Sequence, residues 1–210
     1  MKLDWYKSLD WFKKTPKVRY VLFVCSGNTC RSPSAEYFFN KVARNAGLGV
    51  VAFSRGTEVK AILEGLKARG INIDTLFLEP ETVKAIGESA SYMKKHAATQ
   101  VSKGNISTAD LVLTVEASVR DKLRAANPDA AYKIFTLKGF VSQNENSSGL
   151  DIGNPFMPPP IRKKEGIVEG KVGYYKYIQN YAKVFAEIQV LVRQLIEILY
   201  LLEHEKNAKV

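Results

Sequence analysis

The chain has 210 residues, 46% of them hydrophobic, which is enough for one packed core, and we expect a single domain. Its 31 basic residues outnumber its 21 acidic ones, and the resulting net charge of +10 raises the encounter rate with anionic partners. A secretory signal pattern and a run of 18 uncharged apolar residues are both missing, so the sequence predicts a cytoplasmic protein without a membrane span.

The first 18 residues are expected to form an N-terminal extension, ahead of a domain that runs from 19 to 210. Apolar residues at helical spacing predict one short helix there that ends before Pro16: Leu3, Trp5, Tyr6, Leu9, Trp11 and Phe12. Because two tryptophans are costly to leave in water, we expect this helix to dock on the domain. A partner-binding arm and a wall of the functional cleft are the alternatives.

Further along the chain, the apolar pattern alternates between strand and helix periods. Strands are expected at 21–25, 49–54, 110–115 and 132–137, and helices at 34–46, 59–69, 80–95, 116–126 and 171–203. This alternation predicts an α/β fold, a single doubly wound domain with a central four-stranded parallel sheet and a long C-terminal helix. The apolar stripe of that last helix is broad, which leaves a monomer and a weak dimer both open.

The loop after the first strand, at 25–33, reads CSGNTCRSP and carries the candidate chemistry. Five residues separate Cys25 from Arg31, so the loop can curl around a tetrahedral oxyanion with backbone N–H groups and a helix N-terminus pointing inward. A nearby cation and helix N-terminus favour the nucleophilic thiolate form of a cysteine. The planar guanidinium of Arg31 can bind two phosphate oxygens at once. The loop follows the carboxyl end of a strand, which is where doubly wound parallel sheets bind their ligands.

Neighbouring polar residues fit the same site. Ser32 can donate to the Cys25 thiolate, and Asn28 can hold the loop through its backbone or through Ser32. The alternative is a buried structural cysteine with Arg31 as a surface charge, but nucleophile, anion ligand, glycine and strand-to-helix context occur together. The residues expected to bind phosphate are Ser26, Gly27, Asn28, Thr29, Cys30, Arg31 and Ser32.

Other ligand classes find less support. Both cysteines lie in the loop, so no disulfide framework is expected and a reducing compartment is implied. His96 has no second ligand at useful spacing, and a lone histidine is more often a hydrogen-bonded structural residue, so we predict no metal. No helix-turn-helix, zinc-finger or RNA-recognition pattern supports nucleic acid as a partner.

The segment 21–36, VLFVCSGNTCRSPSAE, resembles the phosphate-binding loop of the low-molecular-weight protein tyrosine phosphatases. SRGT at 54–57, ADLVLT at 109–114 and KIFTLK at 133–138 resemble later motifs of that family, in the family's order. The resemblance covers most of 19–156. It implies a cysteine-dependent phosphatase that hydrolyses phosphotyrosine on a protein through a phosphocysteine, with no metal or organic cofactor. The chain is longer than the family pattern near 58–80 and 157–170, where we expect insertions.

The segment 151–156, DIGNPF, departs from the family pattern. In the resembling enzymes an aspartate before the proline protonates the leaving oxygen, whereas here Asn154 stands there, and general acid–base catalysis is worth on the order of 10²–10⁴ in rate. Three explanations are open: natural or engineered attenuation that suits substrate trapping, Asp151 as the acid, or a substrate that needs little acid. We favour attenuation. Phe156 is expected either in the pocket wall or in ordinary packing.

Two residues of the loop leave the branch of the family open. Thr29 occupies a position at which many tyrosine phosphatases of the family carry a bulkier aliphatic residue. A threonine at this position resembles the protein-arginine phosphatase branch. The resemblance also implies that Cys30 can form a reversible disulfide with Cys25; a small buried side chain is the alternative. An arsenate reductase relay is excluded, because the chain has no cysteine outside the loop. A phosphate-binding module that reads phosphoproteins without hydrolysing them is the alternative function, and we expect the phosphotyrosine phosphatase.

Overall fold

The computed structural model describes residues 3–15, 17–78, 82–83, 93, 95–155 and 172–207, with 172–179 and 206–207 described for the backbone alone. Its centre is a parallel sheet in the order β2-β1-β3-β4. The strands are β1 (Tyr20–Cys25), β2 (Val51–Gly56), β3 (Leu111–Thr114) and β4 (Ile134–Thr136). The predicted α/β fold with a four-stranded parallel sheet is confirmed.

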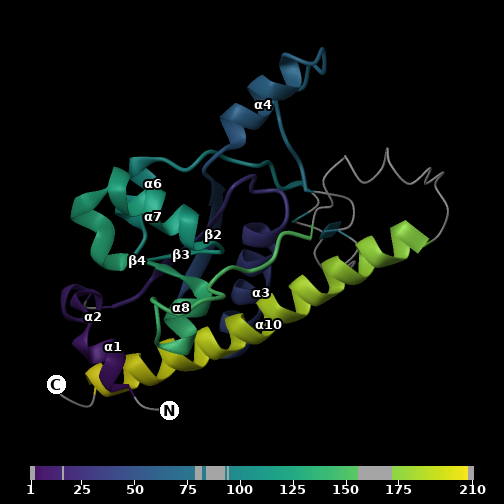
Figure 1. Ribbon diagram of the computed structural model, residues 1–210. Coiled ribbons are helices and arrows are strands. Elements are labelled where there is room, and N and C mark those ends of the chain that lie inside the picture. Colours follow the sequence, from purple (N-terminus) through teal and green to yellow (C-terminus); the bar gives the residue numbers. More distant parts are fainter. Residues whose placement is uncertain are drawn as a thin grey trace.

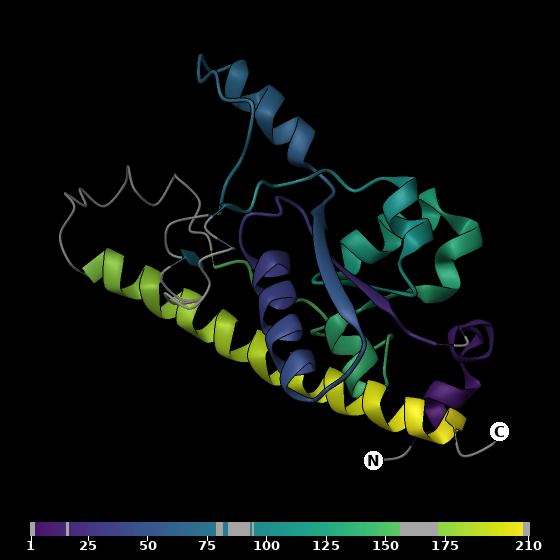
Figure 2. The ribbon, with the colours of Figure 1, turned by 180° about the vertical axis from the view of Figure 1, so that it is seen from behind.

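Helices cover both faces of this sheet, because its central strands are apolar on both sides. On one face lie α3 (Arg31–Asn45) and α10 (Val172–Asn207), and on the other α6 (Lys103–Thr108) and α7 (Ala117–Ala126) (Figures 1 and 2). Val21 and Phe23 of β1 belong to the core cluster that includes α3 and α10, whereas Leu22 and Val24 belong to the cluster of α6 and α7. The doubly wound arrangement therefore follows from the alternation of side chains along one strand.

The remaining elements are short. They are α1 (Asp4–Ser8), α2 (Asp10–Lys14), α4 (Val59–Lys67), the 3-10 helix η2 (Pro128–Lys133) and α8 (Leu137–Ser142). Neither α6 nor α8 was expected from the sequence, and η2 replaces the first part of the strand predicted at 132–137. The helix predicted at 34–46 begins earlier, at Arg31, and so includes the end of the phosphate-binding motif.

The N-terminal segment forms two helices where the sequence predicted one. Leu9 adopts an extended conformation, with ψ of 139°, and separates α1 from α2. The segment docks on the domain: Tyr6 and Trp11 are fully buried, the Tyr6 hydroxyl donates to the Phe140 carbonyl at 2.9 Å, and Trp11 Nε1 donates to the Asp110 carbonyl at 2.8 Å. Burial raises the pKa of Tyr6 to about 12, so this phenol stays a donor.

Several predictions fall outside these elements. Most of the helix predicted at 80–95 lies outside the described residues. The insertion near 157–170 and Phe156 lie wholly outside them. In the region of the insertion predicted near 58–80, α4 projects from the body of the molecule (Figure 1). The domain boundaries and both insertions remain predictions. Among the helices that the structure describes, none combines the length and apolar character needed to cross a membrane.

Candidate active site

The site lies at the carboxyl end of the central strand β1. Cys25 is the last residue of that strand, pairs with Gly56 of β2, and is 3% exposed. The chain then turns through 26–30 and enters α3 at Arg31. This strand, loop and helix follow the order predicted from the sequence, and they place Cys25 next to a helix N-terminus.

Two donors surround the Cys25 sulfur. The backbone N–H of Asn28 donates to Sγ at 3.2 Å, and Ser32 Oγ lies 3.0 Å from Sγ. An amide hydrogen of Asn28 points at Ser32 Oγ at 3.1 Å, so the serine oxygen accepts there and its own proton is available to the sulfur. Both contacts hold the Cys25 sulfur in place beside the N-terminus of α3.

Asn28 connects the loop with the strand and segment beside it. Its φ of 55° lies in the left-handed region, which asparagine tolerates better than most residues. Besides Ser32, Nδ2 donates to Ser54 Oγ at 2.9 Å, and Oδ1 accepts from the Thr99 backbone at 2.9 Å. Asn28 is fully buried, and all three polar groups of its amide have partners.

Behind Asn28 lie two ionisable side chains. The Ser54 hydroxyl donates to Glu36 Oε2 at 2.6 Å, and burial raises the pKa of Glu36 against the lowering effect of that bond. His96 Nε2 lies 3.1 Å from the Asn28 carbonyl and 3.2 Å from its Oδ1. Because both partners are acceptors, we assign the proton to Nε2 of a neutral imidazole, and burial lowers the pKa of His96. His96, expected as a hydrogen-bonded structural residue, here holds the loop.

Gly56 gives the loop the space to approach β2. A Cβ on Gly56 would lie 2.5 Å from the Ser26 carbonyl oxygen and 3.0 Å from the Asn28 nitrogen, so no other residue fits. Backbone N–H groups of Thr57 and Glu58 donate to the carbonyls of Cys25 and Ser26, at 3.0 and 2.9 Å. These contacts explain why the SRGT segment at 54–57 has a glycine at position 56.

Arg31 is held by residues from two other segments of the chain. Its side chain is 7% exposed; Nη1 forms an ion pair with Glu116, just after β3, and donates to the Ile152 carbonyl at 3.0 Å. Glu116 and Ile152 were not identified from the sequence, because they lie 85 and 121 residues from Arg31. A bound anion would share Arg31 with Glu116, and a guanidinium has enough N–H groups for both.

The segment predicted to carry the general acid, 151–156, contains Ile152. Asp151 is exposed, and its Oδ1 accepts from the backbone of Ala117, the first residue of α7, at 2.7 Å. Lys138 Nζ donates to the Asp151 carbonyl at 2.7 Å. Asn154 is also exposed, and Pro155 is buried. The carboxylate of Asp151 therefore caps a helix.

The other predicted loop residues surround the turn. Ser26, Gly27 and Thr29 are half-buried, and Cys30 is buried in the main core. Neither Cys25 nor Cys30 forms a disulfide. Across the part of the chain that the structure describes, no three His, Cys, Asp or Glu side chains form a group that could hold a metal.

Comparison with known proteins assigns the chain to a family. The family model described as low molecular weight phosphotyrosine protein phosphatase matches residues 20–207. The chain belongs to this family. A protein-arginine-phosphatase of Bacillus subtilis is 29% identical over 175 residues, 83% of this chain and 93% of that protein. A low molecular weight protein-tyrosine-phosphatase of Streptomyces coelicolor is 34% identical over 141 residues, 65% of this chain and 77% of that protein.

Solved structures of low molecular weight phosphatases share the fold. The crystal structure of a low molecular weight protein tyrosine phosphatase from T. tengcongensis has a TM-score of 0.61 and 29% identity, covering 85% of this chain and 98% of that one. The resemblance stated from the sequence is thereby confirmed, and the chain is a member of a family of protein phosphatases.

Proposed function

We propose that this low molecular weight phosphatase hydrolyses phosphotyrosine on a protein substrate through a phosphocysteine intermediate. The observation that carries the proposal is the position of the Cys25 sulfur, which receives hydrogen bonds from the Asn28 backbone and Ser32 at the N-terminus of the helix that begins with Arg31. The thiolate attacks phosphorus, so that an S–P bond forms and the bond to the tyrosine oxygen breaks. Arg31 and the loop amides stabilise the charge on the transferring phosphoryl oxygens.

In the second step water attacks the phosphocysteine, inorganic phosphate leaves and the thiolate is restored. Each step involves a proton: the departing tyrosine oxygen accepts one and the attacking water loses one. Asn154 can donate a hydrogen bond but cannot deliver a proton. Asp151 accepts the Ala117 N–H at the N-terminus of α7, and this contact supports a structural role. We therefore propose an attenuated enzyme in which both protons exchange with solvent.

Two observations favour a second candidate, a protein-arginine phosphatase. Thr29 supplies a hydroxyl and little bulk in the phosphate loop, and the Bacillus subtilis relative, which this chain covers over 93% of its length, is named for that activity. Phosphoarginine and phosphotyrosine present the same phosphoryl group on different leaving atoms. Direct comparison of the two substrates therefore separates the candidates.

Steady-state hydrolysis of matched phosphotyrosine and phosphoarginine peptides tests the proposal. We expect turnover of the phosphotyrosine peptide by the native chain, none by Cys25→Ser, and a gain of about 100-fold for Asn154→Asp. Rapid acid quenching should recover phosphate on Cys25. Robust turnover of the phosphoarginine peptide alone would establish the second candidate, and binding of phosphopeptide without turnover in either variant would establish a phosphate-binding module.

We further propose a phosphorylated protein as the partner, the cytoplasm as the compartment, and a monomer or weak dimer as the state in solution. The apolar side of α10 supports a monomer, because Tyr181, Ile188 and Leu195 are buried within the chain itself. Light scattering at high concentration checks this, since a mass equal to one chain would end the suggestion of a dimer.

A further inference from the structure

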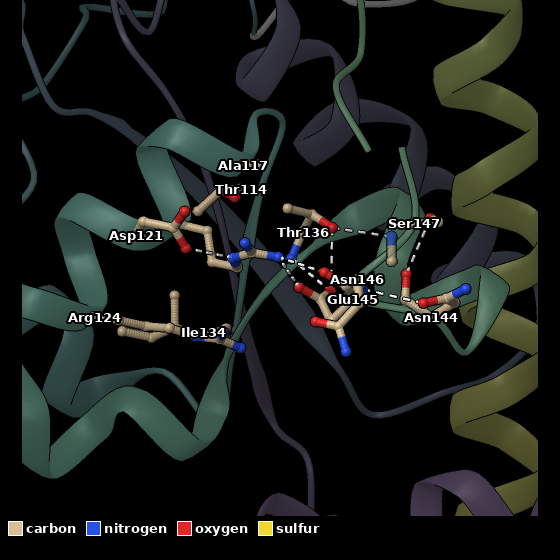
Figure 3. Close-up of polar contacts among 12 residues, drawn as sticks. Thr114, Ala117, Asp121, Arg124, Ile134, Thr136, Asn144, Glu145, Asn146 and Ser147 are labelled. Atoms are coloured by element: carbon tan, nitrogen blue, oxygen red, sulfur yellow. Dashed lines mark hydrogen bonds and ion pairs between the residues drawn. The ribbon is translucent and has the colours of Figure 1, made fainter. Parts of the chain in front are cut away.

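Glu145 is a largely covered carboxylate in the loop that leads from α8 to the active site, and the proposed chemistry does not use it. Its side chain is 12% exposed. Oε1 accepts from the Thr136 backbone N–H at 2.9 Å and lies 3.1 Å from the Thr136 hydroxyl, so Glu145 is held at the end of β4. Figure 3 shows Glu145 against Thr136, with Asn144 and Ser147 in the turn around it.

The other carboxylate oxygen is bound by α7. Arg120 Nη1 lies 2.6 Å from Glu145 Oε2 and also donates to the Glu145 backbone carbonyl at 2.9 Å. The Arg120 side chain is 12% exposed, and its Nε donates to Asp121 at 2.8 Å. Arg120 thus bridges Asp121 on its own helix and both the side chain and the backbone of Glu145, so the ion pair connects α7 with the loop.

Gly139 shows that the chain makes room for this carboxylate. A Cβ on Gly139 would lie 2.3 Å from Glu145 Oε1 and 2.5 Å from Thr136 Oγ1. The Gly139 N–H donates to Thr136 Oγ1 at 3.0 Å, and its carbonyl accepts from the Asn144 backbone at 3.0 Å. Glu145 therefore occupies a space that only a glycine at 139 leaves open, within the cap of α8.

The far end of the loop reaches the catalytic arginine. Seven positions after Glu145, the Ile152 N–H donates to the Val115 carbonyl at 2.8 Å, and the Ile152 carbonyl accepts from Arg31 Nη1. Asp151 caps α7 one position earlier. The start of the loop is thus fixed to α7 and β4, and its end to α7 and to Val115. Arg31 donates to the backbone of the loop at Ile152.

We propose that Glu145 is a positioning residue of the active site: together with Arg120 and Thr136 it fixes the start of the loop whose Ile152 carbonyl orients Arg31. The inference deepens the proposed function and rests on it for its kinetic consequence. Anion binding at Arg31 tests it without turnover. Glu145 touches no reacting atom, so its effect has to pass through the loop.

The test measures how well inorganic phosphate protects Cys25 from alkylation by iodoacetamide, with the modified cysteine assigned by peptide fragmentation. For Glu145→Ala we expect phosphate to bind about fivefold more weakly than to the native chain, a loss of about 1 kcal/mol. Glu145→Gln keeps an acceptor for Thr136 and should lose less phosphate affinity than Glu145→Ala. Arg120→Ala should match Glu145→Ala, and the double variant should be no worse than either.

Glu203→Ala is the matched control, because Glu203 is also an ion-paired glutamate, 3.0 Å from Lys17, but contacts the N-terminal segment. It should leave phosphate protection unchanged. Circular dichroism at the assay temperature checks that each variant is folded. If Glu145→Ala does not fold, Glu145→Gln takes its place in the comparison. The inference would be overturned if phosphate protected Cys25 from alkylation as well in folded Glu145 variants as in the native chain. It would also be overturned if phosphate did not protect Cys25 in the native chain.

Turnover distinguishes this inference from the proposed function. If the native chain hydrolyses phosphotyrosine, Glu145→Ala should lower kcat by roughly tenfold, since small displacements of catalytic groups are costly. A native chain that binds phosphate but turns over neither peptide refutes the proposed function alone. Weakened phosphate binding in Glu145→Ala would still support the positioning role.

Discussion

The side chain of Asn28 joins three separate segments beneath the phosphate loop. Its amide hydrogens point to Ser32 and Ser54, and its oxygen accepts from the backbone of Thr99. Because Ser32 Oγ accepts from Asn28, its own proton is available for donation, and the Cys25 sulfur at 3.0 Å lies nearer than the Arg55 carbonyl at 3.4 Å. The position of the Cys25 sulfur thus depends on Asn28, directly through its backbone N–H and indirectly through Ser32.

Asp151→Asn separates a helix cap from a general acid. The amide oxygen can still accept from Ala117, so we expect a loss of less than about 1 kcal/mol of stability, mainly from the lost charge at the N-terminus of α7. Hydrolysis of a phosphotyrosine peptide should stay within about threefold of the native rate. A fall approaching the roughly 10² that general acid catalysis supplies would instead make Asp151 the acid.

His96 should make stability depend on pH. Burial lowers the pKa of His96 in the folded state, so the unfolded state binds this proton more readily, and stability falls as pH drops below about 6.5. Nearby Glu36 has the opposite sign: its pKa is raised, and its contribution is lost as pH rises through that higher value. Because the two groups act in opposite directions, a loss of stability between pH 7.5 and 5.5 comes from His96 and not from Glu36.

Urea unfolding at pH 7.5 and 5.5 checks this prediction. The native chain should lose stability at the lower pH, and His96→Asn should lose clearly less. The exposed His204, the second histidine, provides the control, and His204→Asn should behave like the native chain. An equal pH effect in native chain and His96→Asn would contradict the assignment.

At the scale of elements, the N-terminal helices are part of the core. Trp11 is 1% exposed, and its ring packs edge-on against Phe140 with centroids 5.2 Å apart. We expect Trp11→Ala to cost about 3–5 kcal/mol of unfolding free energy, as for other buried aromatic truncations. Half-buried Trp5 is the matched control, and Trp5→Ala should cost clearly less. Guanidinium unfolding measures both, and equal small losses would show that the segment is not docked.

The long elements and the order of strand, loop and helix around 25–33 could be predicted because their signals are local. β1 and β3 are continuous apolar runs, and Cys25, Asn28, Arg31 and Ser32 lie within eight residues of each other in sequence. The six-residue helices α6 and α8 were missed because they are too short for apolar periodicity, although Ser102 and Thr136 are suitable N-caps.

The partners of the loop could not be predicted, because they come from distant parts of the chain. Glu116 lies 85 residues from Arg31, and Thr99 lies 71 residues from Asn28. Nothing in the spacing of single residues indicates that these pairs meet. Gly139 and Glu145 are only six residues apart, but their fit depends on the cap of α8, which itself was not expected.

At the scale of the whole molecule, parallel strands bring every part of the site to one edge of the sheet. Cys25 ends β1, Gly56 ends β2, and Glu116 follows β3 by two residues. The loop that contains Ile152 follows α8, which itself begins directly after β4. Four segments far apart in sequence thus converge on Arg31 and Cys25, as expected for the carboxyl edge of a doubly wound sheet.

The net charge of +10 should act on the whole encounter with substrate. The field of a basic protein raises the association rate of anionic partners, and salt screens it, with a Debye length of about 10 Å at 0.1 M. We expect kcat/KM for a phosphotyrosine peptide with acidic flanking residues to fall roughly three- to tenfold between 0.05 and 0.5 M NaCl.

A peptide of equal length with neutral flanks is the control for this salt effect. Under the proposed function its phosphate binds at Arg31, so kcat/KM should still fall with salt, but less steeply than for the acidic peptide. The difference between the two slopes isolates the field of the molecule from the charge at the site. Identical slopes would mean that the excess lysines and arginines lie too far from the approach path to act, and that the basic composition serves solvation alone.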